Sequence, residues 1–74
     1  MDLIKIGKYI AFKRKEQGLT QKQLAEKLNM SDKSVSKWER GICLPDVSVY
    51  LELCKILDIS INEFLAGEDI DRKS

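Results

Sequence analysis

Residues 21–40, QKQLAEKLNMSDKSVSKWER, restrict the fold more than any other stretch of this 74-residue chain. The pattern predicts two short helices, from about residue 21 to 28 and from about residue 32 to 40, joined by a tight turn. Thr20 directly precedes the first helix and Gln23 follows three residues later, which is the pattern of a capping box. The sequence therefore marks the residue at which the first of the two helices begins.

The turn between these helices carries signals of its own. Asn tolerates a left-handed backbone better than any residue except Gly, so Asn29 can end the first helix and turn the chain. Ser31 directly precedes the second helix and can cap it through its hydroxyl. The small Ala25 lies where a second helix would cross closely. Four further side chains are expected to line the buried side of this unit: Leu24, Leu28, Met30 and Val35.

This pattern resembles the helix-turn-helix of phage-repressor-like regulators of the Cro/Xre family, with the small, turn and β-branched residues in the matching places. The resemblance covers residues 4–66 and includes the phrases GLTQKQLAEKL, SVSKWERG and LPD. A bare pair of helices would carry less weight, because αα-hairpins also occur in bundles that never touch DNA. The resemblance implies an all-α, compact five-helix lambda-repressor-like domain over residues 1–67, followed by a short charged tail at 68–74.

Helical periodicity predicts three further helices around the helix-turn-helix unit. Glycine, Asp and Ser at their ends act as caps, since each suits the backbone conformation or the unpaired N–H groups there. The predicted helices are residues 2–17 with Gly18 as C-cap, residues 47–57 with Asp46 as N-cap, and a last helix between the Ser60–Glu63 capping box and Gly67.

Apolar side chains on these helices are expected to form the core. Trp38 follows Val35 by three residues on the inward side of its helix, which favours a core role over base stacking. Cys54 is expected in the core as a small hydrophobe. Val49 and Ile56 either pack on the last helix or form a small exposed patch for a second subunit. The other expected core positions are Leu3, Ile6, Tyr9, Ile10, Leu19, Val47, Tyr50, Leu51, Leu53, Leu57, Ile61, Phe64 and Leu65.

Two charged residues of the first helix interrupt the simple pattern. Lys13 occupies the next position of the apolar stripe, where members of the family usually carry Leu. Either its stem covers apolar surface while the ammonium reaches water, or the helix rotates slightly to bury Phe12. The resemblance also implies a partly buried structural ion pair between Arg14 and Glu39, since a planar guanidinium suits a bidentate bond to a carboxylate.

Length and composition exclude several classes of protein. Seventy-four residues make one small domain without room for a separate catalytic domain. No apolar run is long enough to span a membrane, and no secretory signal begins the chain. With no His, a Cys/His zinc site is excluded, and Cys43 and Cys54 predict reduced thiols in a cytosolic protein. No nucleophile stands beside a base, so neither catalysis nor a metal or other cofactor is expected.

Charge is distributed unevenly although the net charge is only +1. Residues 1–40 hold ten Lys/Arg against five Asp/Glu, a net of +5, whereas residues 41–74 hold three against seven, a net of −4. The basic half contains the helix-turn-helix unit. This polarity modestly favours binding to a polyanion such as DNA.

The resemblance assigns DNA contacts residue by residue. In helix-turn-helix proteins the N-terminal part of the second helix reads base edges in the major groove, which here gives Asp32, Lys33, Ser36 and Lys37. The two lysines, four residues apart, project from one side and can donate to guanine. Asp32 either accepts from cytosine or only complements the helix N-terminus. Phosphate contacts are expected from Gln21, Lys22, Arg40 and Lys13.

The leading hypothesis is a sequence-specific transcriptional regulator of double-stranded DNA, a repressor, in the cytoplasm of a bacterium or phage host. It would bind a near-palindromic operator as a homodimer, at least on DNA, with half-sites about one helical turn apart. Dimer contacts would come from the last helix, the 41–46 loop, or Val49 and Ile56, unless the chain is an N-terminal domain excised from a longer protein. The alternative is a protein-interaction module, such as an antitoxin-like partner, with secondary DNA binding.

Overall fold

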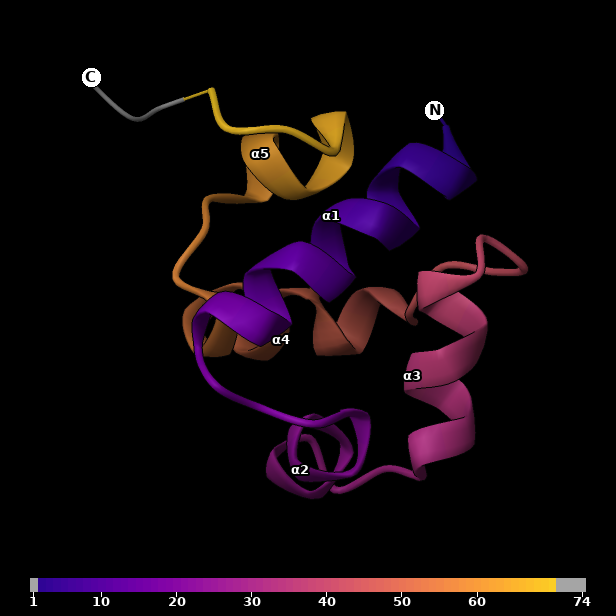
Figure 1. The fold of residues 1–74 in the computed structure, drawn as a ribbon. Coiled ribbons are helices and arrows are strands. Elements are labelled where there is room, and N and C mark those ends of the chain that lie inside the picture. Colours follow the sequence, from indigo (N-terminus) through magenta and orange to yellow (C-terminus); the bar gives the residue numbers. More distant parts are fainter. Residues whose placement is uncertain (1, 71–74) are drawn as a thin grey trace.

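The computed structural model describes residues 2–70 and shows an all-helical arrangement (Figure 1). Five α-helices and one short 3-10 helix follow one another, and no strand occurs within these residues. This agrees with the predicted five-helix fold. The elements are α1 (Leu3–Glu16), α2 (Gln21–Lys27), α3 (Asp32–Glu39), η1 (Val47–Val49), α4 (Tyr50–Leu57) and α5 (Ile61–Ala66).

The long helix α1 is the element to which most of the others attach. In Figure 1 it runs diagonally through the molecule, with α5 above it, α2 below it and α3 to its lower right. α3 packs on both α1 and α2, and α1 also contacts α4 and α5. The helix-turn-helix unit is therefore held in place chiefly by the contact between α3 and α1.

Apolar side chains from all five α-helices meet in one core. The ring of Tyr50 lies 4.9 Å from that of Phe64 in a tilted arrangement, which joins α4 to α5. Trp38 is 3% exposed, so the predicted core role of the only Trp is confirmed. The buried members of the core are Ile6, Ile10, Leu24, Ala25, Val35, Trp38, Leu53, Cys54, Leu57 and Phe64.

Local signals at helix ends were mostly predictive. The side chains of Thr20 and Ser60 both form complete capping boxes, at the starts of α2 and α5. Asn29 adopts a left-handed backbone with φ of 59°, as expected for the turn. The expectation for Ser31 is wrong, because it precedes α3 but its hydroxyl makes no capping hydrogen bond. Asp2 caps α1 by accepting from two backbone N–H groups, a role the sequence analysis missed.

The start of the predicted fourth helix differs from expectation. Asp46 caps η1 rather than an α-helix, and bonds from Ser48 lower the pKa of its carboxyl. A 3-10 turn places side chains at different angles from an α-helix, so Val47 leaves the apolar face and is 73% exposed. Leu51, expected in the core, is 70% exposed because the buried face of α4 is centred on Leu53.

Three other side chains near η1 and α4 are buried or half-buried. Val49 and Ile56 are half-buried and pack against the core, so they do not form the exposed patch. Cys54 is buried, and this burial raises the pKa of its thiol. The large apolar side chains that remain exposed on η1 and α4 are those of Val47 and Leu51.

Lys13 follows neither of the two predicted arrangements. Phe12 is 55% exposed, so α1 has not rotated to bury it, and Lys13 itself is only 4% exposed. The ammonium does not reach water but pairs with Glu16 at 3.1 Å and Asp69 at 3.0 Å. The hydroxyl of Tyr9 donates to the same Asp69 carboxylate at 2.7 Å. A distant carboxylate therefore supplies the partner that makes a buried lysine tolerable.

Ion pairs and a hydrogen bond connect the segment after α5 to α1 and α5. Besides Asp69, Glu68 pairs with Lys5 of α1. The backbone N–H of Ile70 donates to the carboxylate of the buried Glu63 at 3.1 Å. Residues 68–70, the first part of the predicted charged tail, thus lie against α1 and α5, while residues 71–74 lie outside the described residues.

Gly7 marks a close crossing of α1 and α3 that the sequence analysis did not identify. A Cβ atom placed on Gly7 would lie 2.3 Å from the carbonyl oxygen of Trp38 and 2.8 Å from that of Glu39. Contacts below 3.0 Å essentially do not occur for real Cβ atoms. Only a residue without a side chain lets the two backbones approach this closely.

Candidate nucleic-acid interface

The turn between α2 and α3 fixes the second helix at an angle to the first. The chain reverses at Asn29, and the N–H of Met30 then donates to the carbonyl oxygen of Ala25 at 2.8 Å. Ala25 and Leu24 of α2 and Val35 of α3 are at most 1% exposed. Buried contacts between the two helices therefore hold them together, and one face of α3 is buried in the core.

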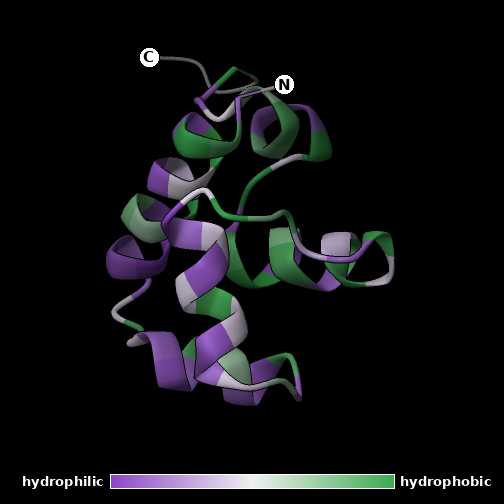
Figure 2. Ribbon diagram, turned by 90° about the vertical axis from the view of Figure 1, so that its right-hand side faces the viewer, coloured by the Kyte–Doolittle hydropathy of each residue, from purple (hydrophilic) through white to green (hydrophobic). Residues whose placement is uncertain are grey.

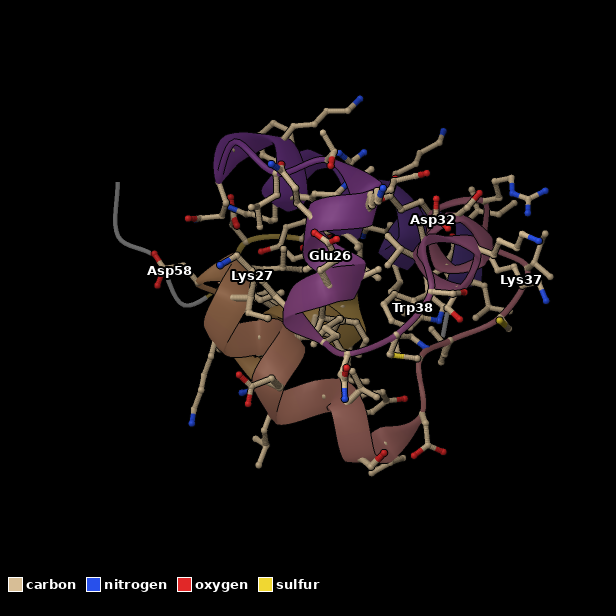
Figure 3. All side chains as sticks on the ribbon, turned by 90° about the horizontal axis from the view of Figure 1, so that it is seen from below. Glu26, Lys27, Asp32, Lys37, Trp38 and Asp58 are labelled. Atoms are coloured by element: carbon tan, nitrogen blue, oxygen red, sulfur yellow. The ribbon has the colours of Figure 1, made fainter. Side chains whose placement is uncertain are left out.

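The remaining surface of α3 is polar. Figure 2 views the molecule from the side of α3. In this view the ribbon of α3 is mostly purple and white, with little green. Figure 3 shows Lys37 pointing away from the body of the protein, while the neighbouring Trp38 lies toward the interior. A buried apolar face and an exposed polar face on one short helix form the arrangement that a groove-reading helix needs.

The four predicted base-reading residues share this helix but differ in exposure. Asp32, Lys33 and Lys37 are exposed, with Asp32 in the first turn. Ser36 is half-buried, and its carbonyl oxygen accepts a hydrogen bond from Nε of Arg40 at 3.3 Å. The two exposed lysines, one helical turn apart, offer ammonium donors on the same side of the helix.

Three of the four predicted phosphate-binding residues lie on the helix-turn-helix unit. Gln21 is the first residue of α2 and is half-buried, Lys22 follows it and is exposed, and Arg40 is exposed at the end of α3. Lys13 does not fit this role. Its ammonium is buried and held between Glu16 and Asp69, so it is not presented to a phosphate.

The predicted ion pair between Arg14 and Glu39 is present and bidentate. Nε of Arg14 donates to one carboxylate oxygen of Glu39 at 2.6 Å, and Nη2 donates to the other at 3.1 Å. Both side chains are at most 10% exposed. Arg14 also donates from Nη1 to the carbonyl oxygen of Leu19 at 2.8 Å, which fixes the chain just before α2.

One link of this network was not foreseen from the sequence. Nε2 of Gln21 donates to Oε1 of Glu39 at 3.0 Å, so α1, α2 and α3 are joined through a single carboxylate. No sequence signal identifies this bond, because Gln21 and Glu39 are brought together only by the angle between α2 and α3.

Other kinds of site find little support in the described part of the chain. Within residues 2–70 no group of three or more Cys, Asp or Glu side chains is placed to hold a metal ion. No described helix has the length and apolarity needed to cross a membrane. Cys43 is exposed and Cys54 is buried, and the two are not bonded to each other.

The fold and the polar second helix define a helix-turn-helix domain, and comparison with known proteins agrees. The chain belongs to the helix-turn-helix family, whose pattern it matches over residues 10–64. It is 32% identical over 69 residues to the HTH-type transcriptional regulator ImmR of Bacillus subtilis, covering 93% of this chain and 54% of ImmR. It is 39% identical over 64 residues to the HTH-type transcriptional regulator DicA of Escherichia coli, covering 86% of this chain and 47% of DicA.

Solved structures show the same fold. The restriction-modification controller protein C.AhdI from Aeromonas hydrophila matches with a TM-score of 0.76 and 32% identity, over 85% of this chain and 96% of that one. The clp gene regulator ClgR from C. glutamicum matches with a TM-score of 0.77 at 24% identity, over 90% of this chain and 86% of that one, which is a likeness of fold alone. The predicted Cro/Xre-type fold is thereby confirmed.

The chain spans about half the length of ImmR and of DicA. It is also 39% identical over 57 residues to the HTH-type transcriptional activator BcrR of Enterococcus faecalis, a match that covers 77% of this chain but only 28% of BcrR. These proteins are named as regulators and not as enzymes, in agreement with the sequence-based expectation. One of the relatives is named an activator, so membership of the family does not fix the sign of regulation.

Proposed function

We propose that this chain is a sequence-specific binding domain for double-stranded DNA and that α3 enters the major groove. The observation that carries the proposal is the division of α3 into two faces. Val35 and Trp38 are buried in the core, while Asp32, Lys33 and Lys37 are exposed on a helix that packs on α1 and α2. Base edges in the major groove offer hydrogen-bond patterns that such side chains can read.

Each polar residue has a defined part in this proposal. Lys33 and Lys37 donate to guanine O6 and N7, Ser36 permits close approach of the helix, and Asp32 accepts from cytosine or complements the helix N-terminus. Phosphate contacts from Gln21, Lys22 and Arg40 set the register of α3 on the duplex. Lys13 has no part in this proposal because of its buried ion pairs.

We further propose that the protein represses transcription as a homodimer that occupies a near-palindromic operator in the cytoplasm. One domain covers one half-site, and a two-fold axis relates half-sites about one helical turn apart. The exposed apolar side chains of Val47 and Leu51 offer a surface for a second subunit. The same surface supports the alternative function, a protein-interaction module with secondary DNA binding.

Selection from a random duplex library with the purified chain tests this function. Enrichment of a near-palindrome supports a dimeric operator reader, and a single enriched half-site supports a monomeric one. A salt titration on the enriched duplex follows. With about four to six phosphates neutralised per half-site, log K should fall with log salt at a slope of roughly −4 to −5 per half-site. Absence of any enrichment, with binding only at low salt and no salt-resistant protein partner, contradicts both functions.

A further inference from the structure

The network around Glu39 does more than join three helices. The carboxylate is at most 8% exposed and its two oxygens accept three hydrogen bonds, two from Arg14 and one from Gln21. Arg14 cancels the negative charge with two donors from one planar group. A carboxylate can therefore lie near the proposed DNA surface without repelling the phosphates strongly.

The bond to Glu39 fixes which way the Gln21 amide faces. An ionised carboxylate can only accept hydrogen bonds, so the amide must present its NH2 group to Glu39 and turn its oxygen away. The amide is planar, and the direction of its second N–H follows once the first is engaged. Gln21 is half-buried, so part of this side chain remains accessible on the surface of α2.

We propose that Glu39 is a positioning residue for DNA binding: held by Arg14, it orients the Gln21 carboxamide so that the second N–H meets a backbone phosphate. This inference rests on the proposed function, and it gives the buried ion pair a role beyond stability. The free side chain of a glutamine samples many rotamers, and ordering it on binding lowers affinity. In this protein the bond to Glu39 already orders the side chain of Gln21 before DNA binds.

A double-mutant cycle separates positioning from general stabilisation. The variants are Gln21→Ala, Glu39→Gln and the pair combined, measured on the enriched duplex at a temperature where circular dichroism shows each variant folded. Each single change is expected to weaken binding about tenfold, as for one hydrogen bond to a charged group. The double variant should lose about the same factor of ten, because Glu39 acts through Gln21.

Lys22→Ala supplies the matched background, since Lys22 is the neighbouring predicted phosphate contact and does not touch Glu39. In that background Glu39→Gln should still cost its full factor of about ten. If the double variant Gln21→Ala/Glu39→Gln binds the duplex about a hundredfold more weakly than the unsubstituted chain, the two changes act independently, and the positioning role is overturned. A reduced effect in the Lys22→Ala background also overturns it, because the coupling would then reflect loosening of the whole surface.

A second measurement needs no substitution and remains valid if Glu39→Gln fails to fold. In ¹⁵N spectra of the unsubstituted free protein, the side-chain amide proton of Gln21 that faces Glu39 should be shifted downfield of the range of solvent-exposed glutamines. Addition of the duplex should move mainly the other proton. Equal movement of both protons, or of neither, overturns the inference. If the unsubstituted chain fails to bind duplex at every salt concentration, the proposed function itself fails, which is a distinct result from binding without coupling.

Discussion

At Gly7 the backbones of α1 and α3 lie so close that a single methyl group should disturb the domain. In Gly7→Ala, the new Cβ would start 2.3 Å from the carbonyl oxygen of Trp38, and the helices must separate until this distance exceeds 3.0 Å. The obstructing atoms belong to the backbone and not to a flexible side chain, so the strain cannot be relieved by a change of rotamer. The whole contact between α1 and α3 must adjust.

Two effects of opposite sign set the magnitude. Ala is a better helix former than Gly by about 1 kcal/mol, which favours the variant. Overpacking in a well-packed site costs about 1–3 kcal/mol, and a clash with backbone belongs at the upper end of that range. The steric effect therefore prevails, and we expect Gly7→Ala to lower the free energy of unfolding by about 2 kcal/mol.

Urea denaturation followed by the fluorescence of Trp38 measures this change, because the only Trp is buried beside the crossing. Lys8→Ala is the matched control on the exposed side of α1 and should stay within about 0.5 kcal/mol of the unsubstituted chain. A Gly7→Ala variant as stable as the unsubstituted chain, or more stable by the propensity difference, would refute the close crossing.

Three further predictions follow from the same contacts. Lys37→Ala should weaken binding to the enriched duplex about tenfold to a hundredfold in a fluorescence anisotropy titration, and unchanged affinity would remove Lys37 from the interface. Asp69→Asn should destabilise the domain by about 1–2 kcal/mol in urea, since Lys13 loses one charged partner and keeps Glu16; no change would show that Asp69 does not hold Lys13. A thiol reagent such as DTNB should modify the exposed Cys43 rapidly and Cys54 only on unfolding, because burial shields that thiol and raises its pKa; equal rates would contradict the buried position.

The features that sequence analysis predicted correctly are those with local causes. The capping boxes at Thr20 and Ser60 depend on residues three positions apart, and the left-handed turn depends on Asn29 alone. The core position of Trp38 follows from helical periodicity. The ion pair of Arg14 with Glu39 is not local, and only the resemblance to a known family indicated it.

The features that sequence analysis missed depend on tertiary geometry. Lys13 is buried because Asp69, far along the chain, returns to α1 and supplies its partner. Leu51 is exposed because it lies two residues before Leu53 in the same helix, on the side of α4 that faces away from the core. The bond between Gln21 and Glu39 and the crossing at Gly7 arise only once the helices are placed in space.

The central claim is that α3 reads DNA, and a titration of the ¹⁵N-labelled chain with the enriched duplex tests it most directly. We expect the largest changes in backbone amide shifts at residues 32–37 and at residues 20–22, with α4 and α5 nearly unchanged. Changes concentrated on α4 and α5, with α3 unaffected, would contradict the claim and assign the helix-turn-helix surface another role.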